Sequence, residues 1–317
     1  MAPAVFLSRR VPVRVREALE RSFELTVHDD ERPPSREELL AAVAGKDGLV
    51  TMLTDRVDAE LLDTAGPRLR VVADYAVGVD NIDLEEASKR GVVVANTPGV
   101  LTAATAELTI ALLLALARRV VEGDRLIRRR ERWILAPTFM LAPGVQGRTL
   151  GIVGLGRIGS EVARLAAGLG MTVVYSGRWP KDDVPWRFVP LAELLAEAHV
   201  VSLHCPLTPE TRRLIGPAEL GAMRREGLLV NVARGPVVDE DALVEALQGG
   251  EIAGAALDVF EHEPEVHEGL LGLENVVLVP HLGSATHEAR EAMGMLCVEA
   301  LRAVLLDGSR PANAVTA

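Results

Sequence analysis

The sequence has 317 residues, about twice the length of a typical domain, so we expect two hydrophobic cores. Apolar residues make up 49% and charged residues 25% of the chain, the balance of a globular protein, and the formal net charge is −11. This acidic balance, without a large basic cluster, argues against nucleic-acid binding. Two cysteines, Cys205 and Cys297, cannot build a disulfide framework or a zinc site, so we expect a reducing compartment and no metal.

The apolar stretches argue against secretion and against a membrane span. Residues 1–10 lack the long apolar segment of a signal peptide. Residues 108–117 form the longest strongly apolar stretch, far short of the ~20 residues that cross a bilayer. We therefore expect a cytoplasmic protein that binds no membrane. The one local excess of charge, at 128–132, is interpreted as a solvated helix face, because charge runs usually have no partner.

Short β-branched runs alternate with amphipathic segments along almost the whole chain, which predicts a doubly wound α/β architecture. Several runs are continuously apolar, as in parallel strands covered on both faces. Helical spacing is clearest at 157–169, 239–248 and 286–306. Strands are predicted at 4–7, 49–53, 70–73, 92–95, 150–153, 172–175, 200–204, 228–232, 253–258 and 276–279.

Two seams interrupt this alternation. Residues 96–99, Asn-Thr-Pro-Gly, have turn chemistry just before a long apolar helix, and residues 281–284 precede the last long helix. The pattern alone does not say whether both seams separate the same two domains.

A glycine-rich turn follows the strand predicted at 150–153 and opens a helix. Gly154 permits the tight turn, Gly156 lets a pyrophosphate approach the backbone, and Gly159 lets the helix pack closely on the strand. Free N–H groups at the helix start then face the phosphates. A glycine turn without a ligand is the alternative, but the strand-turn-helix context favours a dinucleotide site.

The second strand of this unit ends without the acid that an NAD site usually presents about 20 residues past the turn. Ser176, Gly177 and Arg178 stand there instead. A guanidinium fork without a repelling carboxylate suits a 2′-phosphate, so we predict a preference for NADPH over NADH. Stacking of Arg178 on the adenine of either cofactor is the alternative.

Unexpected polar residues follow three predicted strands: Arg234, Glu263 and His281. Ligands of open α/β sheets bind beyond the carboxyl ends of strands, so these are the positions to suspect. Arginine can hold a carboxylate and polarise the neighbouring carbonyl. Histidine can donate a proton near neutral pH, and a carboxylate beside it favours the imidazolium and fixes the ring. Each residue alone is more often structural, but together they suit the reduction of a 2-keto acid.

Over nearly its full length the sequence resembles the D-isomer-specific 2-hydroxyacid dehydrogenase family. The matching blocks are Val77 to Asp83, Gly154 to Gly159, Leu203 to Thr208, Asn231 to Gly235, Asp258 to Pro264 and Pro280 to Thr286. Within the family it is most similar to glyoxylate/hydroxypyruvate reductases, on the stretches Leu53 to Asp58, Tyr175 to Arg178 and His281 to Thr286.

The resemblance implies a role for each matching residue. Arg234 binds the substrate carboxylate and carbonyl, His281 is the acid/base, and Glu263 is its partner. The substrate also meets the backbone of Val77 and Gly78, with Leu53 and Ser284 nearby. The cofactor contacts are Leu155, Gly156, Arg157 and Ile158 at the pyrophosphate, Ser176, Gly177 and Arg178 at the adenosine ribose, Pro206, Val232 and Gly283 along the cofactor cleft, and Asp258 at the carboxamide.

The resemblance also implies the domain organisation and the reaction. A Rossmann cofactor domain, 99–284, is inserted into a flavodoxin-like substrate domain, 1–98 plus 285–317. The family forms homodimers through the cofactor domain, with the region around Trp133 in a projecting arm. Hydride from NADPH would reduce glyoxylate or hydroxypyruvate to glycolate or D-glycerate, in a cleft that closes and excludes water.

Other activities of related proteins stay open or are disfavoured. D-lactate and phosphoglycerate dehydrogenases remain alternatives, because a few pocket contacts set side-chain specificity. Formate dehydrogenases place Gln where Glu263 stands, which argues against that activity. A cofactor-sensing regulatory protein is a further alternative, since relatives of this fold act as corepressors. Retention of the whole Arg–Glu–His set favours an enzyme.

Overall fold

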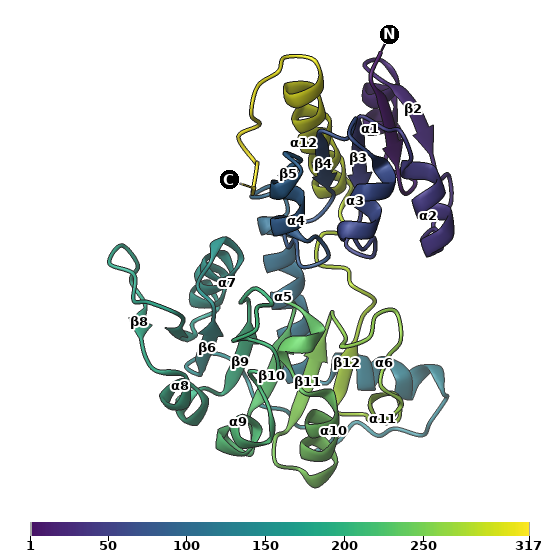
Figure 1. Ribbon diagram of the computed structural model, residues 1–317. Helices are drawn as coiled ribbons and strands as arrows, with labels where there is room; N and C mark the ends of the chain where they lie inside the picture. Colours follow the sequence, from purple (N-terminus) through teal and green to yellow (C-terminus); the bar gives the residue numbers. More distant parts are fainter. Residues whose placement is uncertain (1, 317) are drawn as a thin grey trace. The chain divides into compact units, whose positions relative to one another are not determined.

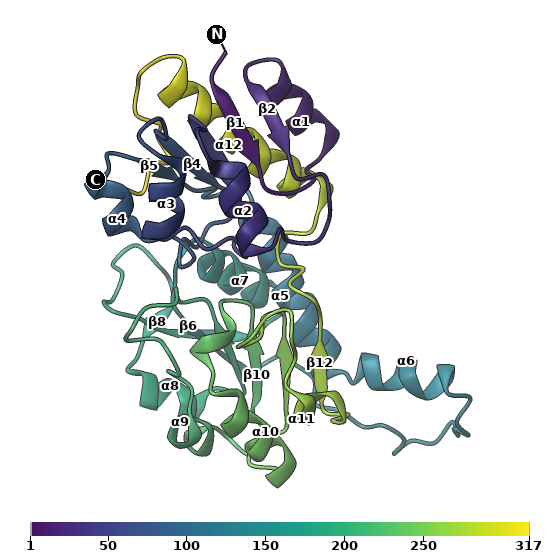
Figure 2. The same ribbon diagram turned by 45° about the vertical axis from the view of Figure 1, so that its right-hand side comes forward.

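The computed structural model describes residues 2–316, which form two compact units (Figures 1 and 2). Unit 1 runs from the N-terminus to Leu101 and resumes at Ala285, and unit 2 is Thr102–Ser284. The predicted first boundary, between residues 98 and 99, lies three residues before this division, and the second coincides with it.

Unit 1 is a five-stranded parallel sheet between two helical layers. The strand order is β2-β1-β3-β4-β5, and every strand pairing is parallel. Helices α1 (Val13–Glu20) and α12 (His287–Leu305) cover one face, and α2 (Arg36–Val43), α3 (Ala59–Ala65) and α4 (Leu84–Lys89) cover the other (Figure 2). The strands are β1 (Ala4–Leu7), β2 (Glu24–Val27), β3 (Gly48–Thr51), β4 (Val71–Asp74) and β5 (Val93–Ala95).

Unit 2 is a seven-stranded parallel sheet, in the order β12-β11-β10-β9-β6-β7-β8. Helices α5 (Thr102–Ala117) and α7 (Arg157–Gly168) bury one face of it. The other face packs on α8 (Leu191–Glu197), α9 (Pro217–Ala222), α10 (Glu240–Gly249) and α11 (Glu268–Leu271) (Figure 1). The strands are β6 (Thr149–Val153), β7 (Thr172–Ser176), β8 (Arg187–Phe188), β9 (Val200–Leu203), β10 (Leu228–Asn231), β11 (Gly254–Leu257) and β12 (Val276–Leu278), and a 3₁₀ turn, η1, spans Gly235–Val237.

All ten predicted strands are present, with ends shifted by at most two residues, and the two doubly wound parallel sheets confirm the predicted fold class. The sequence did not predict β2 and β8, which are edge strands of their sheets. Both edge strands leave residues partly exposed, so neither carries the continuous apolar run that marks a central strand. The predicted helices correspond to α7, α10 and α12.

An arm projects from unit 2 after α5. It comprises α6 (Val120–Arg128) and the extended segment that leads to β6 (Figure 2). The prediction that 128–132 forms a solvated helix face was only partly right. The arginines are exposed, but α6 ends at Arg128 and Arg130 has a left-handed backbone with φ of 57°. A left-handed residue cannot continue an α-helix, so the charge run lies mostly beyond it.

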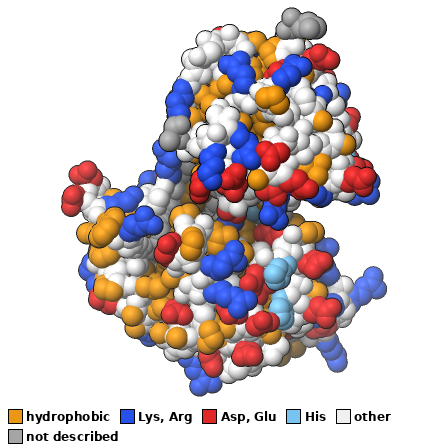
Figure 3. Space-filling view, in the orientation of Figure 1, with side chains coloured by type: hydrophobic (Ala, Val, Ile, Leu, Met, Phe, Trp, Pro, Cys, Tyr) orange, Lys and Arg blue, Asp and Glu red, His pale blue; other side chains and the backbone are white. Residues whose placement is uncertain are grey.

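Acidic and basic side chains are interspersed on the face of each unit seen in Figure 3. Within residues 2–316, no helix has both the length and the apolar character needed to cross a membrane. Among the same residues there is no group of three or more His, Cys, Asp or Glu side chains placed to hold a metal ion.

Candidate active site

The glycine turn has the geometry that its sequence predicts. Gly154 follows β6 with φ of +94°, a left-handed conformation that favours glycine, and a Cβ there would lie 2.7 Å from the backbone nitrogen of Cys205. A Cβ on Gly159 would collide with the carbonyl oxygen of Gly154. These two glycines therefore let β6, α7 and the end of β9 approach one another closely.

Space for a phosphate lies at the second glycine of the turn. Gly156 is exposed, and nothing lies within 4 Å of the position that its Cβ would take. Helix α7 begins at the next residue, Arg157, without a side-chain cap. The open backbone and the start of a twelve-residue helix fit the pyrophosphate of a dinucleotide.

At the end of β7, the residues predicted to face the adenosine ribose differ in their exposure to solvent. Ser176 is buried, with 7% of its surface exposed, whereas Gly177 and Arg178 are exposed. The following loop is tied to the strand, because the backbone N–H of Lys181 donates to the hydroxyl of Tyr175 at 2.7 Å. This bond holds the turn that carries Gly177 and Arg178, leaving the guanidinium in solvent.

His281 and Glu263 form a hydrogen-bonded pair. The His281 Nδ1 atom lies 2.8 Å from Glu263 Oε2, and both side chains are about three-quarters buried. The other carboxylate oxygen, Oε1, accepts the backbone N–H of Phe260 at 3.0 Å. Because Nδ1 faces the carboxylate, Nε2 is the nitrogen left to exchange a proton with a ligand.

Electrostatics favour an ionised Glu263. Burial by itself raises the pKa of this carboxyl, but the hydrogen bond and charge of His281 and the charge of Arg234 more than offset burial, so the pKa lies below its ordinary value. Glu263 is therefore an anion at neutral pH, and its Oε2 atom can only accept the hydrogen bond from His281 Nδ1.

Asp258 holds the backbone that carries His281. It is 1% exposed, and its carboxylate accepts the N–H groups of Leu282 at 2.5 Å and Gly283 at 2.8 Å. His281 itself has a left-handed backbone, with φ of 53°, which costs a non-glycine residue on the order of 1 kcal/mol. Burial raises the pKa of Asp258, although the two N–H groups and the nearby imidazole act in the opposite direction.

Arg234 follows β10 and is half-buried. Its Nη1 atom donates to the carbonyl of Ala233 at 2.9 Å, and Asn231 Nδ2 donates to the Arg234 carbonyl at 3.0 Å. The backbone of the loop is thus held from the end of β10, and the guanidinium contributes to the field at Glu263.

Two uncharged side chains, His204 and the buried Cys205, follow β9. Burial lowers the pKa of His204 to about 3, and its Nε2 atom lies 2.8 Å from the Ser202 hydroxyl. Burial also raises the pKa of the Cys205 thiol to about 11. Pro206 is exposed after these two neutral side chains, and Thr211 Oγ1 donates to its carbonyl at 2.6 Å.

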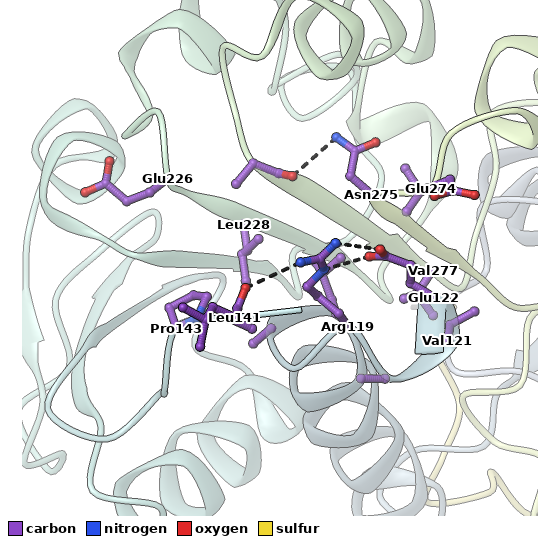
Figure 4. A pocket seen from close by; sticks show the side chains of 16 residues that line it. Arg119, Val121, Glu122, Leu141, Pro143, Glu226, Leu228, Glu274, Asn275 and Val277 are labelled. Atoms are coloured by element: carbon purple, nitrogen blue, oxygen red, sulfur yellow. Dashed lines mark hydrogen bonds and ion pairs between the residues drawn. The ribbon is translucent and has the colours of Figure 1, made fainter. Parts of the chain in front are cut away.

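A cavity of about 440 Å³ lies at the opposite end of the same sheet and is separate from these residues. Its walls come from the end of α5, the base of the arm and the starts of β10 and β12 (Figure 4). The Arg119 guanidinium lies in the wall of the cavity and donates hydrogen bonds to the carboxylate of Glu122 at 2.7 Å and to the carbonyl of Leu141 at 3.4 Å. None of the predicted site residues lines this cavity.

Comparison with known proteins shows the family of this chain. Residues 110–283 match the NAD binding domain of the D-isomer specific 2-hydroxyacid dehydrogenases. The chain is 48% identical over 324 aligned positions to a glyoxylate reductase of Thermococcus litoralis, covering 99% of this chain and 97% of the relative. The chain belongs to the D-isomer-specific 2-hydroxyacid dehydrogenase family. It is an NAD(P)-dependent oxidoreductase.

Solved structures of similar proteins agree with the fold of this dehydrogenase. A protein from Thermus thermophilus superposes with a TM-score of 0.93 at 49% identity, covering 99% of this chain and all of that one. An NADPH-dependent glyoxylate/hydroxypyruvate reductase from Sinorhizobium meliloti, solved with NADP and malonate, has a TM-score of 0.87 at 34% identity, covering 99% and 97% of the two chains.

Unit 2 of the dehydrogenase contains most of the predicted site residues. The catalytic candidates Arg234, Glu263 and His281 follow β10, β11 and β12, three neighbouring strands. The predicted cofactor contacts lie at the ends of β6, β7 and β9, with Ser176 the last residue of β7, or in the loops after β10, β11 and β12. Ser284 is the last residue of the unit. Val232 is 8% exposed and Gly283 is buried, so Val232 offers little side-chain surface and Gly283 only its backbone.

Three predicted substrate contacts of the dehydrogenase belong to unit 1. Leu53 follows β3, and Val77 and Gly78 follow β4. The second loop is held by Asn96, whose Nδ2 atom donates to the carbonyl of Val77 at 2.7 Å. The first loop is held by the buried Asp55, which accepts the N–H of Met52 at 2.8 Å. The roles of these residues toward a substrate stay predictions.

Sequence reasoning missed two residues that shape the site. Glu240 is 5% exposed and accepts the N–H of Glu261 at 2.6 Å, and Arg213 forms an ion pair with the Glu261 side chain at 3.1 Å. An acid at the start of a helix usually means only a favourable dipole interaction. Nothing in the sequence distinguishes Glu240 from the exposed Asp241 beside it.

Proposed function

We propose that this enzyme reduces glyoxylate and hydroxypyruvate to glycolate and D-glycerate, with NADPH as the preferred cofactor. The observation that carries the proposal is the His281–Glu263 hydrogen bond of 2.8 Å, in one unit with Arg234 and the glycine turn. The curated relatives support glyoxylate as a substrate, because proteins 48–51% identical over nearly the whole chain are named glyoxylate reductases.

The bound cofactor would supply the hydride, and the protein residues would supply binding and the proton. Arg234 binds the carboxylate of the keto acid and polarises its carbonyl with the same guanidinium. His281 holds a proton at Nε2 and donates it to the alkoxide oxygen, because Glu263 keeps Nδ1 hydrogen-bonded. In the reverse direction the neutral imidazole accepts that proton.

The end of β7 supports the preference for NADPH. The exposed Arg178 and Gly177 offer a cation and an open backbone, and no carboxylate takes the last position of the strand. A relative that is 34% identical was solved with NADP. A 2′-phosphate would receive a charge-assisted hydrogen bond that a 2′-hydroxyl cannot match.

We also propose a homodimer formed through unit 2 and its arm. Apolar side chains of the arm are exposed, with Trp133 at 52%, Ile134 at 66% and Leu135 at 97%. Exposed apolar clusters of this kind mark association sites. Residues 118–132 carry seven arginines and three acidic residues in a chain whose net charge is −11, so the net electrostatic attraction between this arm and a second copy favours association.

One assay tests the reaction. Oxidation of NADPH and of NADH is followed with glyoxylate, hydroxypyruvate, pyruvate and phosphohydroxypyruvate. The expected result is the highest kcat/KM with NADPH and one of the first two acids. Faster turnover with NADH would overturn the cofactor preference, and preference for pyruvate or phosphohydroxypyruvate would favour a D-lactate or phosphoglycerate dehydrogenase. NADPH binding without turnover of any acid would favour a regulatory protein.

A further inference from the structure

Glu240, the first residue of α10, is a buried carboxylate outside the catalytic set. Only 5% of its surface is exposed, and burial raises the pKa of its carboxyl. A buried carboxylate is costly unless it is hydrogen-bonded. Its Oε1 atom accepts the backbone N–H of Glu261 at 2.6 Å, a bond to the loop that follows β11.

That bond lies where two catalytic loops touch. Gly235 directly follows Arg234, and a Cβ on Gly235 would collide with the carbonyl group of Phe260. The loop after β10 and the loop after β11 are therefore packed backbone against backbone. Glu240 belongs to the helix that continues the first loop and bonds a residue of the second.

Glu261 is held on both its main chain and its side chain. Arg213 Nη2 lies 3.1 Å from Glu261 Oε1, and Arg213 Nη1 lies 3.1 Å from Asp239 Oδ2, at the cap of α10. The Arg213 side chain is half-exposed, so its ion pairs are screened and weak. Glu240 is buried, so its hydrogen bond to the Glu261 N–H is expected to hold the loop after β11 more strongly than the ion pairs of Arg213 do.

Residues on either side of Glu261 orient the His281 ring. Phe260, just before it, donates its N–H to Glu263 Oε1 at 3.0 Å, and the other oxygen of that carboxylate bonds His281. We propose that Glu240 is a positioning residue: by accepting the Glu261 N–H, it sets the carboxylate of Glu263 against His281 and keeps that pair in register with Arg234. This inference rests on the proposed function and deepens it.

Three variants separate this role from a general effect on the fold. Glu240→Ala removes the acceptor, Glu240→Gln keeps an oxygen that can accept the Glu261 N–H, and Asp241→Ala is the matched control. Asp241 is the next residue of α10, and its side chain is 77% exposed. Urea unfolding first establishes that each variant is folded at the assay temperature.

Turnover gives the first result. With the best substrate, kcat of Glu240→Ala is expected to fall on the order of tenfold or more, while KM for the cofactor stays within about twofold of wild type. Glu240→Gln is expected to restore most of the lost kcat, and Asp241→Ala to match wild type. A folded Glu240→Ala with wild-type kcat would overturn the proposal, as would a Glu240→Gln as impaired as the alanine variant.

Ring-nitrogen NMR of His281 gives a second result that needs no turnover, with the signals assigned from a His281→Gln variant. Glu240→Ala is expected to change the Nδ1 signal or to speed the exchange of its proton, and Asp241→Ala to leave both unchanged. If the Nδ1 signal and its proton exchange in Glu240→Ala matched those of wild type, the proposed role of Glu240 would be wrong. If the wild type turns over none of the keto acids, the proposed function fails, and this measurement still decides the role of Glu240.

Discussion

Asp258 and Gly283 are joined by a hydrogen bond of 2.8 Å from the glycine N–H to the buried carboxylate. Gly283 is held from its other side as well, since Thr105 Oγ1 donates to its carbonyl at 2.9 Å. A Cβ on this glycine would lie 3.1 Å from the Asp258 oxygen and 3.4 Å from Thr105. The loop that carries His281 is therefore fixed between β11 and α5.

Asp258→Asn is expected to loosen this loop. An amide has one acceptor oxygen where the carboxylate offers two, so either Leu282 or Gly283 would face an amide NH₂. Leaving one buried N–H without an acceptor costs about 1–3 kcal/mol, which urea unfolding measures. Turnover should fall as well, because His281 needs its left-handed backbone. Unchanged stability together with unchanged kcat would contradict this account of Asp258.

His281→Ala and Arg234→Ala are expected to fail in different ways. Without His281 the alkoxide has no proton donor, so kcat should fall about 10²–10⁴-fold while the cofactor still binds. Arg234→Ala should lower kcat and also raise KM for the keto acid, because the same guanidinium binds its carboxylate. Steady-state kinetics and fluorescence titration with NADPH measure both. Near-normal turnover in His281→Ala would make the acid/base assignment wrong.

The pH dependence of stability should report Glu263. Its pKa in the folded protein lies below the ordinary value of 4.5, so the ionised carboxylate stabilises the fold above that pH. This contribution is lost as pH falls through the lowered folded pKa. We expect the free energy of unfolding of wild type, minus that of Glu263→Gln, to decrease as the pH falls below 4.5. An increase on acidification would show that the folded pKa is raised instead.

Arg178→Ala tests the basis of cofactor preference. Loss of one charge-assisted hydrogen bond to a 2′-phosphate should raise KM for NADPH about tenfold or more and leave KM for NADH nearly unchanged. Arg164→Ala is the control, because Arg164 is an exposed arginine of α7 paired with Glu161. Equal weakening of both cofactors would instead support stacking of Arg178 on the adenine.

Leu135→Asp tests the dimer. Leu135 is 97% exposed in the single chain, so an aspartate there should not disturb the fold of unit 2. If the arm forms the contact with a second copy, burying this charge should shift the protein toward the monomer in light scattering. Leu306→Asp, at an exposed leucine of unit 1, is the control. A Leu135→Asp protein as dimeric as wild type would exclude Leu135 from the interface.

The sequence predicted the elements whose signals are local. Continuous apolar runs marked the central strands, since buried parallel strands must be apolar on both faces. Together with the glycine turn, the polar residues after the strands made Arg234, Glu263 and His281 the catalytic candidates, because the carboxyl ends of parallel strands meet at one edge. The structure places them after the neighbouring strands β10, β11 and β12. The edge strands β2 and β8 were not predicted, since their partly exposed residues do not form a continuous apolar run.

Only the tertiary structure decided how these residues are held. Glu263 accepts hydrogen bonds from Phe260 with one oxygen and from His281 with the other. Asp258 accepts the backbone N–H groups beyond His281, and Glu240 accepts the backbone N–H of Glu261. These contacts join segments far apart in sequence or depend on loop geometry. A carboxylate that accepts a backbone N–H has no partner side chain to mark it in the sequence. Residue types therefore indicated the chemistry, and loop packing determined its geometry.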